Sequence, residues 1–414
     1  MVVRASNLQS RFTAHLTGVR AFVVALVCGS VVASVACSLV LTDDGLVGRS
    51  QDAGPSLDGS GGAGGSGGTA GAAGSGGHTC DANRVDCDGV AENGCETDLS
   101  STSTHCGACN HDCLSGSCDQ GRCQPFELAE GQDSPLRIAV DDTHLYWTNQ
   151  GGQGAVMRLA LSGGAEEQVA VSNHPPGGFV LDDQAVYWSE YAPQGSVWRL
   201  AKADIGTSLL PTELASSQAT SISAAVDTDH VYWVTPGTVR RVLKTGGSVE
   251  NLANGQSTPF GLVVDLGQVY WTTVTGGEIK SRDLLDPDSS PIILANGQDY
   301  PVGLEIDLSN LYWSNNQGDA DGGTPKILRM ARANMVEPEV VVDGLEGPGP
   351  LVAFGADLYW TDSVGGTVMR VPKIGGTPQV LAAGQGAPTG IAVTPDVVYW
   401  VNRDDGRVMG VVRE

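Results

Sequence analysis

The dipeptide Tyr-Trp constrains this chain more than any other feature, because it recurs at a nearly constant interval. Its seven copies are Tyr146-Trp147, Tyr187-Trp188, Tyr232-Trp233, Tyr270-Trp271, Tyr312-Trp313, Tyr359-Trp360 and Tyr399-Trp400. Successive copies lie 41, 45, 38, 42, 47 and 40 residues apart. A repeat of about 40 to 45 residues is the length of one four-stranded blade of a β-propeller. The spacing therefore predicts a ring of seven blades.

Each copy contains four short apolar runs. In the sixth copy they are Pro350 to Phe354, Leu358 to Thr361, Thr367 to Pro372 and Thr377 to Ala382. The runs are rich in β-branched and aromatic residues, are separated by Gly, Asp and Asn, and include no amphipathic stretch of helical length. We expect them to form strands A, B, C and D of an all-β blade.

Tyr and Trp are neighbours on strand B, so their side chains should point to opposite faces of the sheet. In a propeller, neighbouring blades cover both faces, and each aromatic ring can bury about 150 to 250 Å². We interpret the Tyr-Trp copies as structural contacts between adjacent blades.

An arginine recurs on the predicted C strand in five copies. These residues are Arg158, Arg199, Arg241, Arg329 and Arg370, with Ser281 and Gly410 in the other two copies. If the first B–C hairpin is centred between Gly152 and Gln153, Arg158 lies opposite Trp147 and stacks on it, a contact worth about 0.5 to 2 kcal/mol. The same count pairs Trp233 with Arg241 and Trp360 with Arg370. The alternative is that these arginines point toward a ligand.

The seventh copy ends after its C strand, so its outer strand must come from elsewhere. The segment Phe126 to Ala129, followed by Glu130-Gly-Gln, matches the end of the sixth copy, Gln379 to Ala382 followed by Ala383-Gly-Gln. We expect residues 125–130 to supply the outer strand of the last blade and to close the ring. The propeller would then span residues 125–414.

The repeats resemble the class B repeats of low-density-lipoprotein receptors, the YWTD propellers, and similar propellers on bacterial surfaces. The sixth copy reproduces the motif as Tyr359-Trp360-Thr361-Asp362, whereas the others keep only Tyr-Trp. The resemblance covers residues 125–414, although YWTD propellers have six blades. It implies a fold and a habit of binding partners, without naming a ligand.

The N-terminal residues 1–36 have the features of a signal peptide. Three arginines and no acidic residue precede a largely apolar run from Ala21 to Ala36, which is shorter than the roughly 20 residues of a transmembrane helix. Cys37 follows Ser34-Val-Ala, an arrangement that resembles the lipobox of bacterial lipoproteins, whose cysteine is acylated. The resemblance, with Ser38 after the cysteine, implies anchoring in the outer membrane. Ordinary cleavage without lipid attachment is the alternative.

Residues 37–79 read as a flexible tether, because Gly59 to Gly77 is almost entirely Gly, Ser, Ala and Thr and cannot bury a core. Such a chain has a reach of roughly 35 Å. The formal charge is -24, and removal of the three arginines of the signal peptide would make it -27. This charge repels the phosphate backbone, so we expect no nucleic-acid partner.

Residues 80–124 carry eight of the ten cysteines: Cys80, Cys87, Cys95, Cys106, Cys109, Cys113, Cys118 and Cys123. An even number of cysteines in a short exported segment with few apolar residues predicts a framework of four disulfides, whose pairing the sequence does not determine. Zinc is the alternative, since His105 and His111 flank the pair Cys106-Gly-Ala-Cys109.

The same segment contains a partial calcium-binding pattern. Asp86, Asp88 and Asn93 provide oxygen atoms near a glycine, as calcium loops do, but the remaining ligands of a complete loop are missing. The pattern thus predicts at most a calcium ion near these residues.

Four of the loops between a D strand and the next A strand share the pattern Gly-Gln-x-x-Pro. Their glutamines are Gln132, Gln256, Gln298 and Gln385. The D–A loops meet at one end of the central tunnel, where a ring of amides could bind a sugar or peptide. The alternative is that these amides hydrogen-bond to neighbouring structure. With Glu305, they make up our candidate binding face.

Two further sets of residues are acidic. Five aspartates stand five residues before Tyr and are expected to form A–B turns, namely Asp141, Asp182, Asp227, Asp265 and Asp307. Glu305 aligns with Ala or Val on the A strands of other copies, so we expect a lone carboxylate in the tunnel with a raised pKa. The alternative is that Glu305 forms a salt bridge or faces a hydrated tunnel.

These features predict an exported, lipid-anchored and monomeric envelope protein whose propeller is a non-catalytic module that binds a protein, peptide or glycan. We assign no catalytic residue, cofactor or metal ligand, because no HExxH, histidine cluster or Ser-His-Asp arrangement is present. The alternative is a hydrolase or lyase that acts at the tunnel through Glu305. Acidic or histidine side chains converging on Glu305 would favour the enzyme.

Overall fold

The computed structural model describes residues 80–413, except 91, 318–322, 334 and 336, together with two short paired strands, β1 (Leu26–Val27) and β2 (Ser38–Leu39). Apart from those two strands, the expected signal peptide and tether lie outside the described residues, and so does Cys37. Within the described part, no helix has the length and apolar character needed to cross a membrane.

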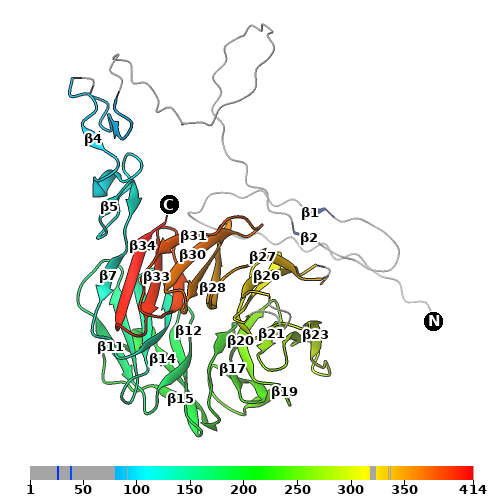
Figure 1. Cartoon of the computed structure of the whole chain (residues 1–414). Coiled ribbons are helices and arrows are strands. Elements are labelled where there is room, and N and C mark those ends of the chain that lie inside the picture. The colour runs from blue at the N-terminus through cyan, green and yellow to red at the C-terminus, as the bar shows by residue number, and fades with distance from the viewer. Residues whose placement is uncertain are drawn as a thin grey trace, which may run out of the picture. The chain divides into compact units, whose positions relative to one another are not determined.

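Seven four-stranded antiparallel sheets are present among the described residues, as the Tyr-Trp spacing predicted (Figure 1). Their strands run in the order A, B, C, D. Blade 1 contains β8 (Pro135–Val140), β9 (His144–Asn149), β10 (Ala155–Ala160) and β11 (Glu167–Val171). Blade 2 contains β12 (Pro176–Leu181), β13 (Ala185–Glu190), β14 (Gly195–Ala201) and β15 (Thr212–Gln218). Blade 3 contains β16 (Ala224–Val226), β17 (His230–Thr235), β18 (Thr238–Leu243) and β19 (Glu250–Asn254). Blade 4 contains β20 (Pro259–Asp265), β21 (Gln268–Thr273), β22 (Glu278–Asp283) and β23 (Ile292–Ala295); blade 5 contains β24 (Pro301–Ile306), β25 (Asn310–Asn315), β26 (Lys326–Ala331) and β27 (Glu339–Val342); blade 6 contains β28 (Pro348–Phe354), β29 (Asp357–Asp362), β30 (Thr367–Pro372) and β31 (Gln379–Ala382); blade 7 contains β32 (Pro388–Val393), β33 (Val397–Asn402) and β34 (Arg407–Val412). A short 3-10 helix, η2 (Lys202–Asp204), follows β14.

The outer strand of blade 7 is β7 (Phe126–Ala129), which pairs antiparallel with β34. The predicted closure by residues 125–130 is therefore confirmed. Phe126 lies opposite Gly410 and is 8% exposed. A Cβ atom at Gly410 would come within 2.9 Å of the Phe126 ring, which explains why the recurring arginine is absent from this blade.

The described residues form seven apolar clusters, and one cluster packs at each contact between neighbouring blades. In every cluster the Tyr of one blade meets the Trp of the next. The pairs are Tyr146 with Trp188, Tyr187 with Trp233, Tyr232 with Trp271, Tyr270 with Trp313, Tyr312 with Trp360, Tyr359 with Trp400 and Tyr399 with Trp147. The last pair joins blade 7 to blade 1. The interpretation of Tyr-Trp as a two-sided structural contact is confirmed.

The prediction that Arg stacks on Trp is wrong, because the pairing of the B and C strands is shifted by one residue from the expected register. Arg158 lies opposite Tyr146, while Met157 lies opposite Trp147. In a strand, a shift of one residue moves a side chain to the other face. The loop after β9 has five residues, so the hairpin is centred on Gly152 rather than after it. Arg158 instead forms an ion pair with Glu167 on the outer strand.

The other predicted arginine pairs behave in the same way. Arg241 lies opposite Tyr232 and bonds to Glu250, and Arg370 lies opposite Tyr359 and bonds to Gln379. These three arginines thus join the C and D strands of their own blades.

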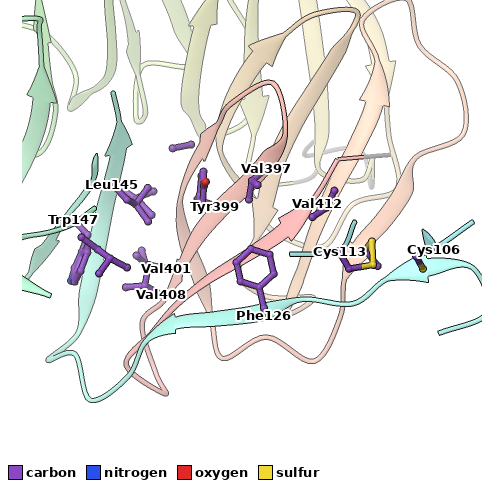
Figure 2. Packing of buried hydrophobic residues seen from close by; sticks show 14 residues of the cluster. Cys106, Cys113, Phe126, Leu145, Trp147, Val397, Tyr399, Val401, Val408 and Val412 are labelled. Carbon is purple, nitrogen blue, oxygen red and sulfur yellow. A yellow bond between two sulfur atoms is a disulfide. The ribbon is translucent and has the colours of Figure 1, made fainter. Parts of the chain in front are cut away.

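The segment before the propeller contains β3 (Arg84–Val85), β4 (Thr97–Asp98), η1 (Ser103–His105), β5 (Cys118–Asp119) and β6 (Arg122–Cys123). Its eight cysteines form the four expected bridges, Cys80–Cys95, Cys87–Cys109, Cys106–Cys118 and Cys113–Cys123. Buried Cys113 and Cys123 belong to the same apolar cluster as Phe126 and Val412 of blade 7, as Figure 2 shows for Cys113.

Candidate functional site

The four glutamines of the Gly-Gln-x-x-Pro loops hydrogen-bond to the tryptophans of their own blades. Each carboxamide oxygen accepts the indole N–H of the Trp that follows fifteen residues later. The pairs are Gln132 with Trp147 at 2.8 Å, Gln256 with Trp271 at 3.1 Å, Gln298 with Trp313 at 2.8 Å and Gln385 with Trp400 at 2.9 Å. Each amide nitrogen also donates to the carbonyl two residues earlier. The glutamine amides therefore hydrogen-bond to neighbouring structure, which was the alternative to a ligand-binding role. Ligand binding through these residues stays a prediction.

The aspartates before Tyr form turns and also join neighbouring blades. In four of the five copies the carboxylate accepts backbone N–H groups two and three residues later, as predicted, at Asp141, Asp182, Asp227 and Asp307. Asp265 differs, because β20 and β21 are joined by only two residues and its carboxylate binds Arg332 instead.

A cation from the next blade reaches four of these aspartates. The ion pairs are Lys202–Asp141, Lys244–Asp182, Arg332–Asp265 and Lys373–Asp307, with N–O distances of 2.7 to 2.9 Å. Burial alone would raise the pKa of Asp141, but Lys202 and the turn N–H groups hold that pKa below its usual range. Sequence reasoning missed these cations. The readable signal was a Lys or Arg three residues after the recurring C-strand arginine.

Glu305 does not lie with the glutamines. It occupies the fifth position of β24, opposite Tyr312, and its Oε1 accepts the N–H of Ile306 at 3.0 Å. It therefore sits on the face of blade 5 that packs on blade 6, toward the A–B turn, rather than in the cavity described below. Burial raises the pKa of Glu305 to about 7, as expected for a lone carboxylate.

No set of metal ligands converges on Glu305 within the described residues. The two groups of potential ligand side chains found there are Cys106, Cys113 and Cys123, and Asp86, Asp88 and Glu96. The three cysteines are already disulfide-bonded, which leaves the zinc alternative without its thiolates. The hydrolase or lyase alternative thus gains no partner residue for Glu305 from this part of the chain.

The weak calcium pattern gives a small acidic cluster. Ligand oxygens of Asp86, Asp88 and Glu96 lie within 4.8 Å of one another, and Asn93 donates its amide to Asp88 at 3.0 Å. The structure thus brings in Glu96 in addition to the three residues named from the sequence. Exposed carboxylates often cluster without a metal, so calcium stays a prediction.

One buried carboxylate near the D–A loops was not anticipated. Glu190 ends β13 and is 2% exposed. It accepts hydrogen bonds from the Ser172 hydroxyl at 3.1 Å and the Ser196 N–H at 2.9 Å, and His174 Nδ1 lies 3.3 Å away. Because these donors satisfy it, we read Glu190 as a support for the loops of blade 2.

A cavity of about 310 Å³ lies at the centre of the ring, lined by residues in or next to the A strands of six blades. Its walls are mainly apolar, with Leu262, Leu304 and Leu351 contributed by successive blades. Tyr300, 42% exposed, lines it from the D–A loop of blade 5. The cavity therefore opens toward the end of the ring formed by the D–A and B–C loops, which we call the loop face.

Arg137 in the cavity wall was also missed by sequence reasoning. It holds the third position of β8, one residue before Ile138, which lies opposite Trp147. The equivalent residues of the other blades are Gly178, Ser223, Gly261, Gly303, Pro350 and Gly390. An alignment of A strands by their distance from Tyr-Trp would have found it.

Comparison with known proteins supports the fold only. No protein-family model and no curated protein matches the sequence. Among solved structures, a streptogramin B lyase has a TM-score of 0.58 and 15% identity, over 70% of this chain and 97% of that chain. Virginiamycin B lyase from Staphylococcus aureus has a TM-score of 0.59 and 14% identity, over 70% and 99%. The WD40 propeller domain of Doa1 has a TM-score of 0.58 and 12% identity, over 70% and 97%. Such low identities carry no information on activity.

Proposed function

We propose that this protein is an exported, lipid-anchored member of the YWTD-like propellers, which binds a protein, peptide or glycan of the cell envelope through its loop face. The anchor would be acylated Cys37, and residues 37–79 would hold the propeller clear of the membrane. Four disulfides support passage through an oxidising compartment.

The observation that carries the proposed binding site is the exposed aromatic rim of the loop face. Tyr300 beside the central cavity and Tyr191 at the end of β13 are 42% and 51% exposed, and Val364 is 70% exposed in the B–C loop of blade 6. Tyrosine is favoured at protein interfaces because it combines a large apolar ring with a hydroxyl group. The four Gly-Gln-x-x-Pro loops lie on the same face.

The binding proposal is tested by crosslinking residues 80–414 to envelope extracts and comparing matched variants. Tyr191→Ala and Tyr300→Ala remove the rim, whereas Leu308→Ala and Ile374→Ala remove side chains of 90% and 83% exposure from turns at the opposite end of the ring. We expect one envelope component to be captured by the wild type and both control variants, and to be lost from the rim variants. Equal capture by all five proteins, or loss from the controls alone, would contradict the proposal.

The anchor is tested separately with the full chain. We expect the wild type to partition into detergent and its mature N-terminal peptide to carry a lipid mass on Cys37. Cys37→Ser should abolish both results. A mature N-terminus at residue 37 without added mass would show ordinary cleavage instead.

A further inference from the structure

Arg137 lines the central cavity and has no ionic partner among the described residues. Its Nη2 donates to the carbonyl oxygen of Ile222 at 2.8 Å, and its Nε donates to that of Gly177 at 3.4 Å. No ion pair within the described residues involves Arg137. Burial lowers the pKa of Arg137 to about 10, so the guanidinium keeps its charge at neutral pH. Arg137 is only partly buried, and a charge in such a mainly apolar wall is stabilised by an opposite charge placed beside it.

The surrounding backbone is shaped to let this side chain cross between blades. A Cβ atom at Gly177 would meet the carbonyl oxygen of Ser221, and one at Gly178 would lie 2.6 Å from the carbonyl carbon of Ser223. These two glycines allow blade 2 to lie directly against blade 3. Arg137 of blade 1 can therefore reach past blade 2 to a carbonyl of blade 3, which fixes the guanidinium in place.

The cavity beside Arg137 has the character of a site for an amphipathic anion. Among the described residues that line it, Arg137 alone carries a charge. Leucines from blades 4, 5 and 6 and Phe260 form apolar walls, while Ser223 and Thr389 add hydroxyl groups. A volume of about 310 Å³ is at the lower end of the range of ligand pockets.

We propose that the central cavity binds a small amphipathic monocarboxylate, with the carboxylate on Arg137 and the apolar body against the leucine walls. A planar guanidinium matches a carboxylate in geometry and in single charge. A phosphate dianion fits less well, because one cation and few hydroxyl groups would leave much of its charge without a partner. This proposal goes beyond the loop-face function and does not depend on a macromolecular partner.

Hexanoate is the probe that tests this site. We expect hexanoate to bind residues 80–414 saturably at one site and to raise the thermal midpoint, because a ligand that binds only the folded state stabilises it. Hexanol, hexylammonium and inorganic phosphate should each bind at least tenfold more weakly, as measured by titration calorimetry. Equal binding of hexanol or phosphate, or no saturable hexanoate binding, would overturn the proposal.

Variants locate the bound carboxylate. Arg137→Met should weaken hexanoate at least tenfold and leave hexanol unchanged, whereas Arg137→Lys should retain part of the affinity. Should Arg137→Met fail to fold, Ser363→Trp on an exposed loop at the cavity mouth should block hexanoate without affecting stability. Unchanged affinity in a folded Arg137→Met or, failing that, in Ser363→Trp rejects the site. Tyr191→Ala should affect only macromolecular capture, so the two proposals fail independently.

Discussion

The seven blades divide into two groups by how they treat the indole N–H of their buried tryptophan. In blades 1, 4, 5 and 7 a glutamine accepts this N–H. In blades 2, 3 and 6 the indole nitrogens of Trp188, Trp233 and Trp360 are buried and have no acceptor among the described residues. The residues fifteen positions before the seven tryptophans are Gln132, Asn173, Gln218, Gln256, Gln298, Leu345 and Gln385. All seven tryptophans are nevertheless almost fully buried.

The three blades without a bond from indole to glutamine differ in the reason for its absence among the described residues. Blade 6 has Leu345 at the required position, and blade 2 has the exposed Asn173. Blade 3 keeps Gln218, but Arg240, which lies opposite Trp233, donates to its oxygen at 2.7 Å. Burial between blades therefore suffices to place the tryptophan, and the glutamine adds stability and fixes the D–A loop.

Blade 7 has the indole bond, although its outer strand comes from the N-terminal end of the propeller. Phe126→Ala tests whether that strand is equivalent to a local one. We expect it to lower the free energy of unfolding by about 3 to 5 kcal/mol, because a buried aromatic side chain leaves a cavity. Denaturant unfolding followed by tryptophan fluorescence measures this. Val380→Ala on β31, where Val380 is 48% exposed, should cost less than about 1 kcal/mol; equal losses would mean that β7 does not hold blade 7.

Gln298→Leu converts a bonded blade into an unbonded one. The change leaves the indole N–H of Trp313 and the amide of Asn315 without their common acceptor, and we expect a loss of about 2 to 3 kcal/mol in denaturant unfolding. Asn173→Leu alters the equivalent position of blade 2, where the described residues offer the indole of Trp188 no acceptor, and should change stability by less than about 0.5 kcal/mol. Similar losses from both variants would remove the distinction between the two groups.

Glu305 replaces the small apolar residue of other blades in blade 5 only, and its effect on the free energy of unfolding should depend on pH. Its pKa is about 7 in the folded protein and 4.5 when unperturbed, so the folded state binds more protons between these values. The stability contributed by the neutral carboxyl is complete below about pH 4.5 and is lost as pH rises through 7. Glu305→Gln should therefore be more stable than the wild type by about 3 kcal/mol at pH 8 and nearly equal at pH 4.5. A pH-independent difference in denaturant unfolding would contradict the raised pKa.

Trp→Phe substitutions separate the indole bond from the burial of the ring. Trp313→Phe and Trp360→Phe both lose part of a buried ring, but only Trp313 donates to a glutamine. We expect Trp313→Phe to cost about 1 kcal/mol more than Trp360→Phe when chemical unfolding is followed by circular dichroism. A larger cost in blade 6 would show that its indole N–H has a partner after all.

Arg240→Met should convert blade 3 to the bonded group. Methionine occupies the equivalent position in three blades, as Met157, Met369 and Met409. The change frees the Gln218 oxygen for Trp233 and removes a buried Nε atom that lacks an acceptor. We expect a gain of about 0.5 to 1 kcal/mol, measured as a rise in the denaturation midpoint. A loss of stability would mean that the ring depends on Arg240.

The sequence predicted the elements of the fold well, because each repeat displayed the same strand pattern and the same aromatic pair. Even the crossing of Phe126 to blade 7 was readable, since its surroundings copy the end of blade 6. The register between the B and C strands could not be predicted from the sequence to within one residue. The length of the loop at Gly152 decides which face Arg158 occupies, and apolar spacing does not reveal that length.

The candidate site was predicted less well, because its residues are exceptions to the repeat. Glu305 stood out in an apolar column, yet the column lies between blades rather than facing the cavity. Arg137 interrupts a column of mostly small residues, which hydrophobic patterning does not single out. The pairing of the cysteines depends on contacts distant in sequence, which no local pattern encodes.

The pairing of β7 with β34 has a consequence for biosynthesis. β7 is synthesised before every other propeller strand and its partner β34 after all of them, so blade 7 cannot be completed until the last strand is available. Interrupted products would leave β7 without this partner and become targets for proteases or for wrong association with other strands. Pairing of the Phe126 segment with β34 thus requires a chain that contains the last strand of the ring.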